Sequence, residues 1–340
     1  MSLKQRSLIG FLVAAIIYVT FAVYLYQPYF KGFNALRLRD LFVVNIILAS
    51  LGCYVLSRRW VAGFGESFFA GAIYGFGPFI LGLAKYHPTI GLLTAAIPWL
   101  FCPAAFGPKG RWQWIRIPLA VLPFLAIALF FQVSTHYRLF PVSTQARLHL
   151  ADLYGLLAPL VMAGRNTNLI GFYHIPIAAL IIGFSMLLAA RRFGIMLIFA
   201  VGTILSFCDS FFGISPIIWF AISMLCCSVL MGAGMQGLAC AGFADRGWIL
   251  AAAAIMCTLA IVTLLLATKY FQTFLGLGAG YAKLLTEAGK MYVLGAIVAA
   301  IIFFMIRAKL RMRQLRQVVL CAAMALDIFL GARFIIDKIL

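Results

Sequence analysis

Acidic side chains are scarce in this sequence. Only 8 of its 340 residues are Asp or Glu, against 27 Lys and Arg, so the formal net charge is +19. Charged residues make up 10% of the chain and hydrophobic residues 65%, whereas soluble globular domains are about one-quarter charged and about half apolar. This composition excludes a soluble globular protein and indicates that lipid is the solvent of most of the chain.

The sequence also lacks clustered metal ligands and a basic domain. Its eight Cys lie inside or at the ends of apolar runs without the paired spacing of zinc or redox sites, so we expect small core residues, no metal and no cofactor. The Lys and Arg residues lie in short connections between apolar runs, where they set topology and meet anionic lipid headgroups. Nucleic acid is therefore not an expected partner.

What the sequence does contain is a series of long apolar runs. A membrane-spanning helix needs about 20 mainly apolar residues, and eleven runs meet that description. They are 7–27, 40–57, 66–84, 88–106, 116–134, 170–190, 193–210, 215–241, 247–268, 289–306 and 317–336. The expected fold is therefore all-α: a polytopic transmembrane helical bundle of about eleven spanning helices, forming a single domain over residues 1–340. The first run is expected to be a retained span, because no small-residue cleavage site follows it.

The distribution of positive charge predicts an orientation. With eleven spans, fifteen of the 27 Lys and Arg residues fall on the N-terminal side, largely because of the basic run from Arg307 to Arg316. Since cytoplasmic loops carry the excess of Lys and Arg, the N-terminus is predicted to be cytoplasmic. All four His residues then fall on or near the outer face, so a polar site is expected to face outward.

Two connections are long enough to hold structure. In the outer connection 136–168, apolar residues recur at helical spacing around Asp152, which predicts a helix lying in the membrane interface. The second outer connection, 269–290, is rich in glycine and then amphipathic. Its glycines at 276, 278 and 280 lack the strand and helix of a dinucleotide-binding loop, so a flexible turn is the expected structure.

Glycine and proline interrupt the third and fourth runs. The stretch from Gly71 to Pro103 includes Pro78 and Pro98 together with several glycines. Irregular backbone inside a membrane is tolerated where protein or a water-filled cavity satisfies the freed polar groups, so a substrate cavity beside Pro78 and Pro98 is one interpretation. The other is ordinary proline kinks that close helix packing.

A cluster of cations is expected at the outer face. Lys85 and His87 end the third run there, and Arg37, Arg39 and Arg165 are predicted to share that face. Cationic donors near the interface favour bound anions, so these five residues form a candidate site for a lipid phosphate or pyrophosphate. The alternative is that isolated side chains extend toward lipid headgroups.

Two carboxylates are candidates for chemistry. Asp40 opens the second run, where it is a candidate general base or a cap of its own helix. Asp327 and Arg333 lie within the last run at a spacing of six, which does not place them on one helix face. Each is therefore expected to need a partner on another helix, and an intramembrane carboxylate is a functional candidate in its own right.

Four stretches in order carry a resemblance to a known family. They are LGCYVLSRRW leading into FFAGAIYGFGPFILGLAKYHP, then TAAIPWLF, then NTNLIGFYHIPIAALIIGF, then ISPIIWFAISMLCCSVLMGAGMQGL, over roughly residues 40–240. In order and spacing they resemble the membrane core of GT-C-type glycosyltransferases, especially the bacterial YfhO-like branch.

This resemblance implies a GT-C-like protein of the bacterial inner (cytoplasmic) membrane that takes a sugar from a polyprenyl-phosphate carrier at the non-cytoplasmic face. The family's base is an acidic residue of the first outer loop, a position that only Asp40 fills, and Lys85 and His87 would lie where the donor phosphate approaches. The chain departs from the family in its first outer loop, which has only about a dozen residues from Pro28 to Asp40. A non-catalytic descendant of the fold is therefore an equal alternative.

Two further hypotheses stay open. A non-enzymatic subunit that packs within a larger membrane protein complex fits the short first outer loop and the few acidic groups. A transporter would show inverted repeats with broken helices in corresponding halves, and the sequence shows such a pair only in the first half. The expected partners are membrane lipids, a polyprenyl-phosphate lipid and other membrane protein subunits.

Overall fold

The computed structural model describes residues 3–30, 38–61, 63–86, 88–106, 113–135, 147–163, 169–191, 193–209, 211, 214–274, 279–308 and 313–340. Within these ranges the regular elements are helices, apart from one isolated β-bridge between Phe211 and Ile214. The all-α fold class predicted from the apolar runs is confirmed.

The helices follow the apolar runs along the chain. The α-helices are α1 (Leu3–Tyr26), α2 (Leu41–Ser57), α3 (Phe64–Gly75), α4 (Pro78–Gly82), α5 (Pro88–Phe106), α6 (Gln113–Thr135), α7 (Pro159–Met162), α8 (Pro176–Ala189), α9 (Phe193–Phe207), α10 (Pro216–Cys240), α11 (Arg246–Leu266), α12 (Lys269–Phe274), α13 (Ala279–Arg307) and α14 (Arg313–Ile339). Short 3-10 helices are η1 (Leu38–Asp40), η2 (Leu83–Lys85), η4 (Leu150–Leu156) and η5 (Phe243–Asp245).

Seven helical stretches of the described chain are long and apolar enough to cross a membrane. They are Ser7–Tyr26, Phe64–Lys85, Pro88–Phe106, Pro216–Cys240, Phe243–Leu266, Gly280–Arg307 and Arg313–Ile339. Four apolar helices are shorter, namely Leu41–Ser57, Leu119–Phe130, Pro176–Ala189 and Phe193–Phe207. Together these indicate a multi-pass membrane protein, while eleven as the number of spans stays a prediction.

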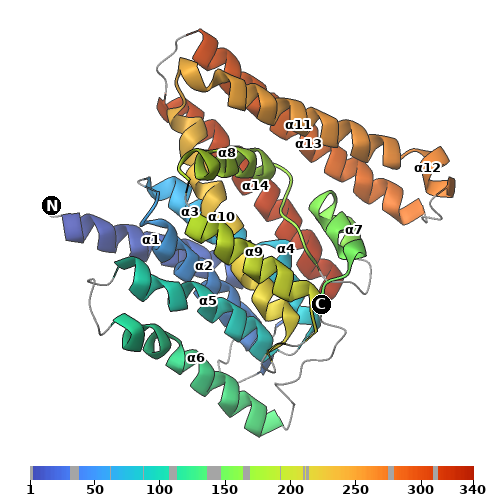
Figure 1. The fold of residues 1–340 in the computed structure, drawn as a ribbon. Helices are drawn as coiled ribbons and strands as arrows, with labels where there is room; N and C mark the ends of the chain where they lie inside the picture. The colour runs from blue at the N-terminus through green and yellow to red at the C-terminus, as the bar shows by residue number, and fades with distance from the viewer. Residues whose placement is uncertain are drawn as a thin grey trace.

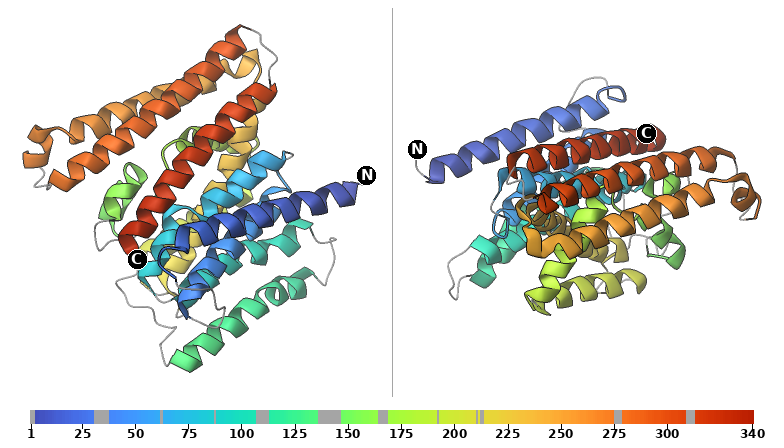
Figure 2. Two further views of the ribbon diagram at one scale, coloured as in Figure 1. Left: turned by 180° about the vertical axis from the view of Figure 1, so that it is seen from behind. Right: turned by 90° about the horizontal axis from the view of Figure 1, so that it is seen from above.

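The bundle has a buried centre and lipid-accessible edges. The apolar window of Phe64–Lys85 is 89% buried and that of α10 is 67% buried, because α10 packs against α3, α8 and α9. In contrast, the windows of α1 and of the α11 stretch are 22% and 33% buried. The α11–α13 pair extends beyond the rest of the bundle toward α12, and α6 lies at the opposite edge against α5 (Figures 1 and 2).

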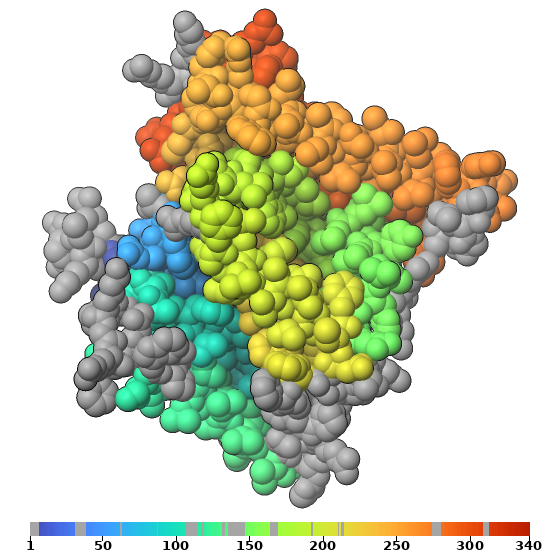
Figure 3. All heavy atoms as spheres, viewed as in Figure 1, coloured from blue at the N-terminus to red at the C-terminus, as the bar shows by residue number. Residues whose placement is uncertain are grey.

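Small residues let the central helices approach closely. A Cβ added at Gly234 of α10 would lie 1.7 Å from the carbonyl oxygen of Ala179 on α8, and one at Gly183 of α8 would lie 2.2 Å from that of Leu230. The backbones of α8 and α10 therefore touch where any larger residue would separate them. This contact holds α8 and α9 over the face of the bundle shown in Figure 3.

The two runs that contain glycine and proline differ in the structure. The third run breaks at Phe76 and Gly77 before Pro78 opens α4, so an interruption is confirmed there. Pro98, in contrast, lies inside the continuous helix α5. Beside it, the indole Nε1 of Trp99 donates a hydrogen bond to the carbonyl oxygen of Leu48 at 3.0 Å, so this part of α5 packs directly on α2.

The structure describes parts of both predicted outer connections. In 136–168, the described part contains η4, on which Leu150 and Tyr154 are exposed while Asp152 is buried. In 269–290, α13 already begins at Ala279, so the later part of this predicted connection is helical. Its first turns extend the helix well before the predicted start at residue 289. Gly280 belongs to this helix, whereas 276 and 278 lie outside the described residues.

Candidate functional site

The expected outer cluster is only partly visible. Arg37, His87 and Arg165 lie outside the described residues. Arg39 is exposed and lies against the end of α1, where its Nη2 donates a hydrogen bond to the carbonyl oxygen of Tyr29 at 3.1 Å. Its guanidinium carbon also lies 5.0 Å from the ring centre of Phe30, a cation–π contact.

Asp40 and Lys85 stand at the ends of neighbouring helices. Asp40 is 2% exposed and occupies the N-cap position of α2, yet its side chain makes no capping hydrogen bond. The expectation that it caps its own helix is therefore wrong. Lys85, the last residue of η2, is half-buried.

Several distant chain segments meet around these two residues. The side-chain amide of Asn45, in the second turn of α2, donates to the carbonyl oxygen of Pro88 at 2.8 Å, which joins the start of α2 to the start of α5. Leu169 packs against Gly82, since a Cβ added at that glycine would lie 2.6 Å from the Cβ of Leu169. The structure therefore brings α2, η2 and the chain at residue 169 to one end of the bundle.

Tyr86 links this end to η4. Burial raises the pKa of Tyr86 to about 12, and the nearby carboxylate of Asp152 contributes to the rise. Asp152 is itself buried, and its Oδ2 accepts a hydrogen bond from the backbone N–H of His149 at 3.0 Å. Ionisable groups from α2, η2 and η4 therefore gather in one region, which we call the α2–η4 end.

A second polar site lies inside the bundle. Asp327, near the middle of α14, is 1% exposed, and its Oδ1 lies 3.0 Å from Nδ1 of His174. Its Oδ2 accepts a hydrogen bond from the backbone N–H of Ile175 at 2.6 Å. Because Ile175 is the N-cap residue of α8, this carboxylate caps α8 from a different helix. A negative charge there is also favoured by the helix dipole.

Two tyrosines complete this polar centre. The Tyr292 ring on α13 meets the His174 ring edge-on with centres 4.9 Å apart, and its hydroxyl donates to the carbonyl oxygen of Leu157. The hydroxyl of Tyr173 donates to the carbonyl oxygen of Phe76 at 2.6 Å. Phe76 lies in the interruption between α3 and α4, so Tyr173 satisfies a carbonyl group that the broken helix has freed.

One ring nitrogen of His174 has no hydrogen-bond partner among the described residues. Its Nδ1 faces a carboxylate and so acts as an N–H donor, which leaves the lone pair of a neutral ring on Nε2. That Nε2 is buried and has no hydrogen-bond partner among the described residues. The centre can therefore accept a proton or a further hydrogen bond at this atom.

These contacts test two expectations about the last run, of which one is confirmed and one is wrong. Asp327 has its partner on another element, as expected. Arg333 does not: its side chain is 59% exposed, and its Nε lies 3.8 Å from the carboxylate of Asp337 on the same helix. His174 is 1% exposed within the bundle, and its placement on or near the outer face stays a prediction.

Sequence analysis placed His174 among the outer histidines and did not pair it with Asp327. The usable signal was its position two residues before Pro176, which opens an apolar helix. A polar residue just before a buried helix start marks a point where backbone N–H groups need a partner. That signal identifies one half of the pair, and the carboxylate 153 positions away requires the fold.

A fourth buried carboxylate lies near the start of α3. Glu66 is fully buried, and its Oε1 accepts a hydrogen bond from the side-chain amide of Gln317 on α14 at 3.1 Å. Its Oε2 has no hydrogen-bond partner among the described residues. Glu66 therefore joins α3 to α14 through one side-chain hydrogen bond, whereas both carboxylate oxygens of Asp327 have partners.

The chain was compared with known proteins. No protein-family model, curated protein or solved structure matches it. The likeness to GT-C-type glycosyltransferases therefore stays a prediction from the four sequence stretches.

Proposed function

We propose that this chain is a GT-C-like multi-pass membrane protein that binds a polyprenyl-phosphate lipid at the α2–η4 end, in bacterial cell-envelope metabolism. The observation that carries the proposal is that the Asn45–Pro88, Gly82–Leu169 and Tyr86–Asp152 contacts bring the segments containing Asp40, Lys85 and Asp152 to this end. Lys85 is half-buried between apolar helices, where a lipid phosphate would neutralise its charge.

Sugar transfer is the finer part of this proposal. In that reaction Asp40 would remove the proton from the acceptor hydroxyl, and the phosphate held by Lys85 would leave from the opposite side of the sugar, which inverts the anomeric carbon. Asp40 is 2% exposed, so an acceptor must displace neighbouring residues to reach it. Lipid binding and transfer are therefore tested separately.

The test of binding is native mass spectrometry of protein purified gently from its membrane. We expect a co-purifying polyprenyl-phosphate lipid that is lost in Lys85→Gln. Lys283→Gln, which removes an exposed lysine near the start of α13, is the matched control and should retain the lipid. Equal retention in both variants, or stoichiometric partner proteins without such a lipid, would contradict the proposal. The second result would support a non-enzymatic subunit of a membrane complex.

Transfer is tested with the same preparation. Asp40→Asn is expected to keep the bound lipid but to abolish release of its sugar to an acceptor, because the amide cannot take the proton. Release at the wild-type rate would remove Asp40 from the reaction while leaving the binding proposal intact.

We also propose eleven spans with a cytoplasmic N-terminus. The seven long and four shorter apolar helical stretches of the described chain support the number, because each coincides with one of the eleven apolar runs. Cys208, just after α9, and Cys240, which ends α10, are both exposed, and the proposal places them on opposite sides of the membrane. A membrane-impermeant maleimide applied to intact cells should label Cys208 and spare Cys240. The reverse pattern would invert the topology.

A transporter is the second candidate, and one observation favours it. The structure adds a non-helical stretch at 169–175 to the interruption between α3 and α4, and the two are joined by Tyr173 beside the His174–Asp327 pair. Broken elements that meet at an ionisable pair inside a membrane are typical of ion-coupled carriers. Proteoliposomes with an internal pH dye should then show proton uptake that His174→Gln abolishes. Uptake equal to that of empty vesicles would exclude this candidate.

A further inference from the structure

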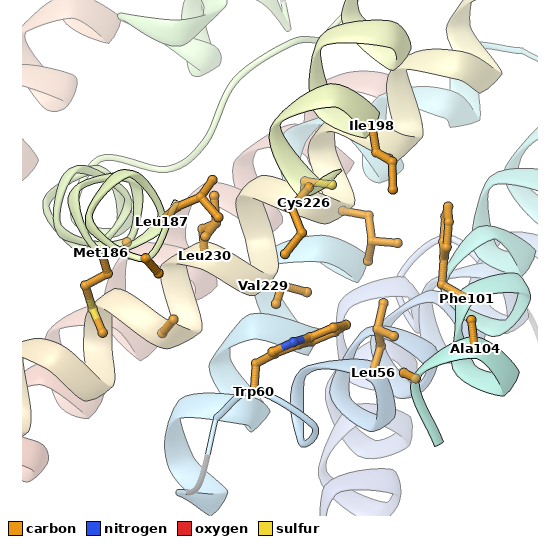
Figure 4. Close-up of a pocket in the computed structure, with 16 residues that line it drawn as sticks. Leu56, Trp60, Phe101, Ala104, Met186, Leu187, Ile198, Cys226, Val229 and Leu230 are labelled. Atoms are coloured by element: carbon orange, nitrogen blue, oxygen red, sulfur yellow. The ribbon is translucent and has the colours of Figure 1, made fainter. Parts of the chain in front are cut away.

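A large apolar cavity opens at the end of the bundle opposite the α2–η4 end. Its volume is about 380 Å³, within the roughly 300–1,000 Å³ of ligand pockets. The walls come from the last turns of α2, α5 and α8, the first turns of α9 and the middle of α10 (Figure 4). The cavity thus lies between two groups of helices that diverge at this end.

The lining of the cavity matches a hydrocarbon chain. Apolar side chains such as Leu56, Phe101, Leu187 and Val229 face it, together with the thiol of Cys226 (Figure 4). Nothing charged lines this cavity among the described residues. An occupant with a polar group along its length would therefore lose hydrogen bonds to water without replacing them.

The mouth of the cavity has the opposite character. Trp60 lines it and is 42% exposed, as expected of an indole at the boundary between hydrocarbon and headgroups. Arg59 precedes it and is exposed. On the facing wall, Ala190 lines the cavity and is followed by the exposed Arg191. Two exposed arginines are therefore adjacent in sequence to residues that line the apolar cavity.

We propose that this cavity binds one acyl chain of an anionic phospholipid, with the phosphate at the mouth beside Arg59 and Arg191. Apolar walls select the chain, and the two cations select the charge of the headgroup, because guanidinium pairs closely with phosphate oxygens. The site is separate from the polyprenyl-phosphate site of the proposed function, which lies at the other end of the helices. Either site can exist without the other.

The test uses the full chain in phosphatidylcholine vesicles that contain phosphatidylglycerol with a photoreactive diazirine on one acyl chain. After illumination, the labelled peptides are mapped by mass spectrometry. We expect the label to concentrate on α10 around Cys226–Ala233 and on the last turns of α5. Label spread evenly over the exposed faces of α1 and α11 would overturn the proposal, as would a co-purifying protein cross-linked at the same α10 segment.

Two pairs of variants test the binding of the acyl chain and the selection of the headgroup separately. Val229→Trp fills the cavity and should abolish labelling of α10, whereas Val262→Trp on the exposed side of α11 should not. The combined change Arg59→Gln and Arg191→Gln should remove the preference for phosphatidylglycerol over phosphatidylcholine bearing the same photoreactive chain. Arg307→Gln, an exposed arginine at the end of α13, should keep it.

A second cavity variant is available if the first one misfolds. If Val229→Trp does not purify as a single species, Ala104→Phe, which narrows the cavity from an exposed position on α5, replaces it. Equal labelling of wild-type protein by both headgroups would refute the role of the two arginines. Undiminished labelling in a folded cavity variant would refute the site itself.

Discussion

Asp327 and Asp40 are both buried carboxylates beside the first turn of a helix, but they are held in opposite ways. Asp40 is at the N-cap of its own helix, α2, and makes no capping hydrogen bond there. Asp327 lies near the middle of α14 and accepts the N–H of Ile175 at the start of α8. The adjacent carboxylate does not cap its helix, whereas a distant one caps α8.

The difference follows from where each helix begins. α2 follows directly on the 3-10 helix η1, so the carbonyl groups of a preceding helical turn lie before its first N–H groups. α8 begins inside the bundle, where His174 and Ile175 are buried. Free N–H groups without water are costly, so a partner must be supplied by the fold. The backbone that precedes the helix start, more than the proximity of a carboxylate in sequence, decides where a carboxylate is needed.

The largest expected effect comes from removing the Asp327 charge. Asp327→Asn leaves an amide that cannot accept from both His174 and Ile175, and a hydrogen bond to a charged group contributes about 1.5–3 kcal/mol. Asp40→Asn should cost much less, since no capping hydrogen bond is lost. Thermal unfolding and size-exclusion chromatography in one detergent measure both variants. Equal thermal midpoints and equal yields of assembled protein would show that Asp327 contributes no more to stability than Asp40.

The same contrast explains how much the sequence could predict. The apolar runs predicted the helices because the hydrophobic length of a span is a local property, and the Gly77–Pro78 step predicted the break before α4 for the same reason. The extension of α13 to Ala279 was missed because charged residues such as Lys283 and Glu287 resemble a connection. The partner of Asp327 could not be predicted, because contact between residues 153 positions apart depends on how α14 packs against α8.

A smaller effect is expected from crowding the polar centre without changing its charge. A Cβ at Gly331 on α14 would lie 2.2 Å from a ring carbon of Tyr173, so Gly331→Ala must move the ring that holds the carbonyl of Phe76. Overpacking of this kind costs about 1–3 kcal/mol. Gly194→Ala on α9 is the matched control, since nothing lies within 4 Å of its Cβ position. Gly194→Ala should keep or raise the thermal midpoint, because Ala favours the helix more than Gly does. Midpoints that fall equally in both variants would show that the Tyr173 contact is not the cause of the loss.

Glu66 sharpens the comparison from the other direction. Its Oε1 has a neutral partner in Gln317 and its Oε2 has none among the described residues, so Glu66→Gln gives up no ion pair. We expect the thermal midpoint to stay the same or to rise. The gain in the free energy of unfolding should be no more than about 1 kcal/mol. The measurement is the same thermal scan used for Asp327→Asn. A loss as large as that of Asp327→Asn would mean that Glu66 has a charged partner.

The smallest effect is expected at the exposed pair between Tyr29 and Asp337, which joins the end of α1 to the end of α14. The hydroxyl of Tyr29 donates to the Asp337 carboxylate, and this hydrogen bond raises the pKa of Tyr29 above its ordinary value of 10.0. A raised pKa of an acid means that folding favours the protonated form. The contribution to stability is therefore complete below pH 10 and is lost as the pH rises through the folded-state pKa.

Tyr29→Phe removes this pH dependence, and comparison with wild type isolates it from other groups that titrate in alkali. We expect the difference in thermal midpoint between the two proteins to be small and constant from neutral pH to about pH 9, and to shrink at higher pH. Asp337→Asn should abolish the same dependence, because the neutral amide no longer favours the protonated phenol. A wild-type advantage that grows with pH would reverse the sign and show that Asp337 does not hold the Tyr29 proton. The difference between the exposed Asp337 and the buried Asp327 would then come from their partners and not from their burial.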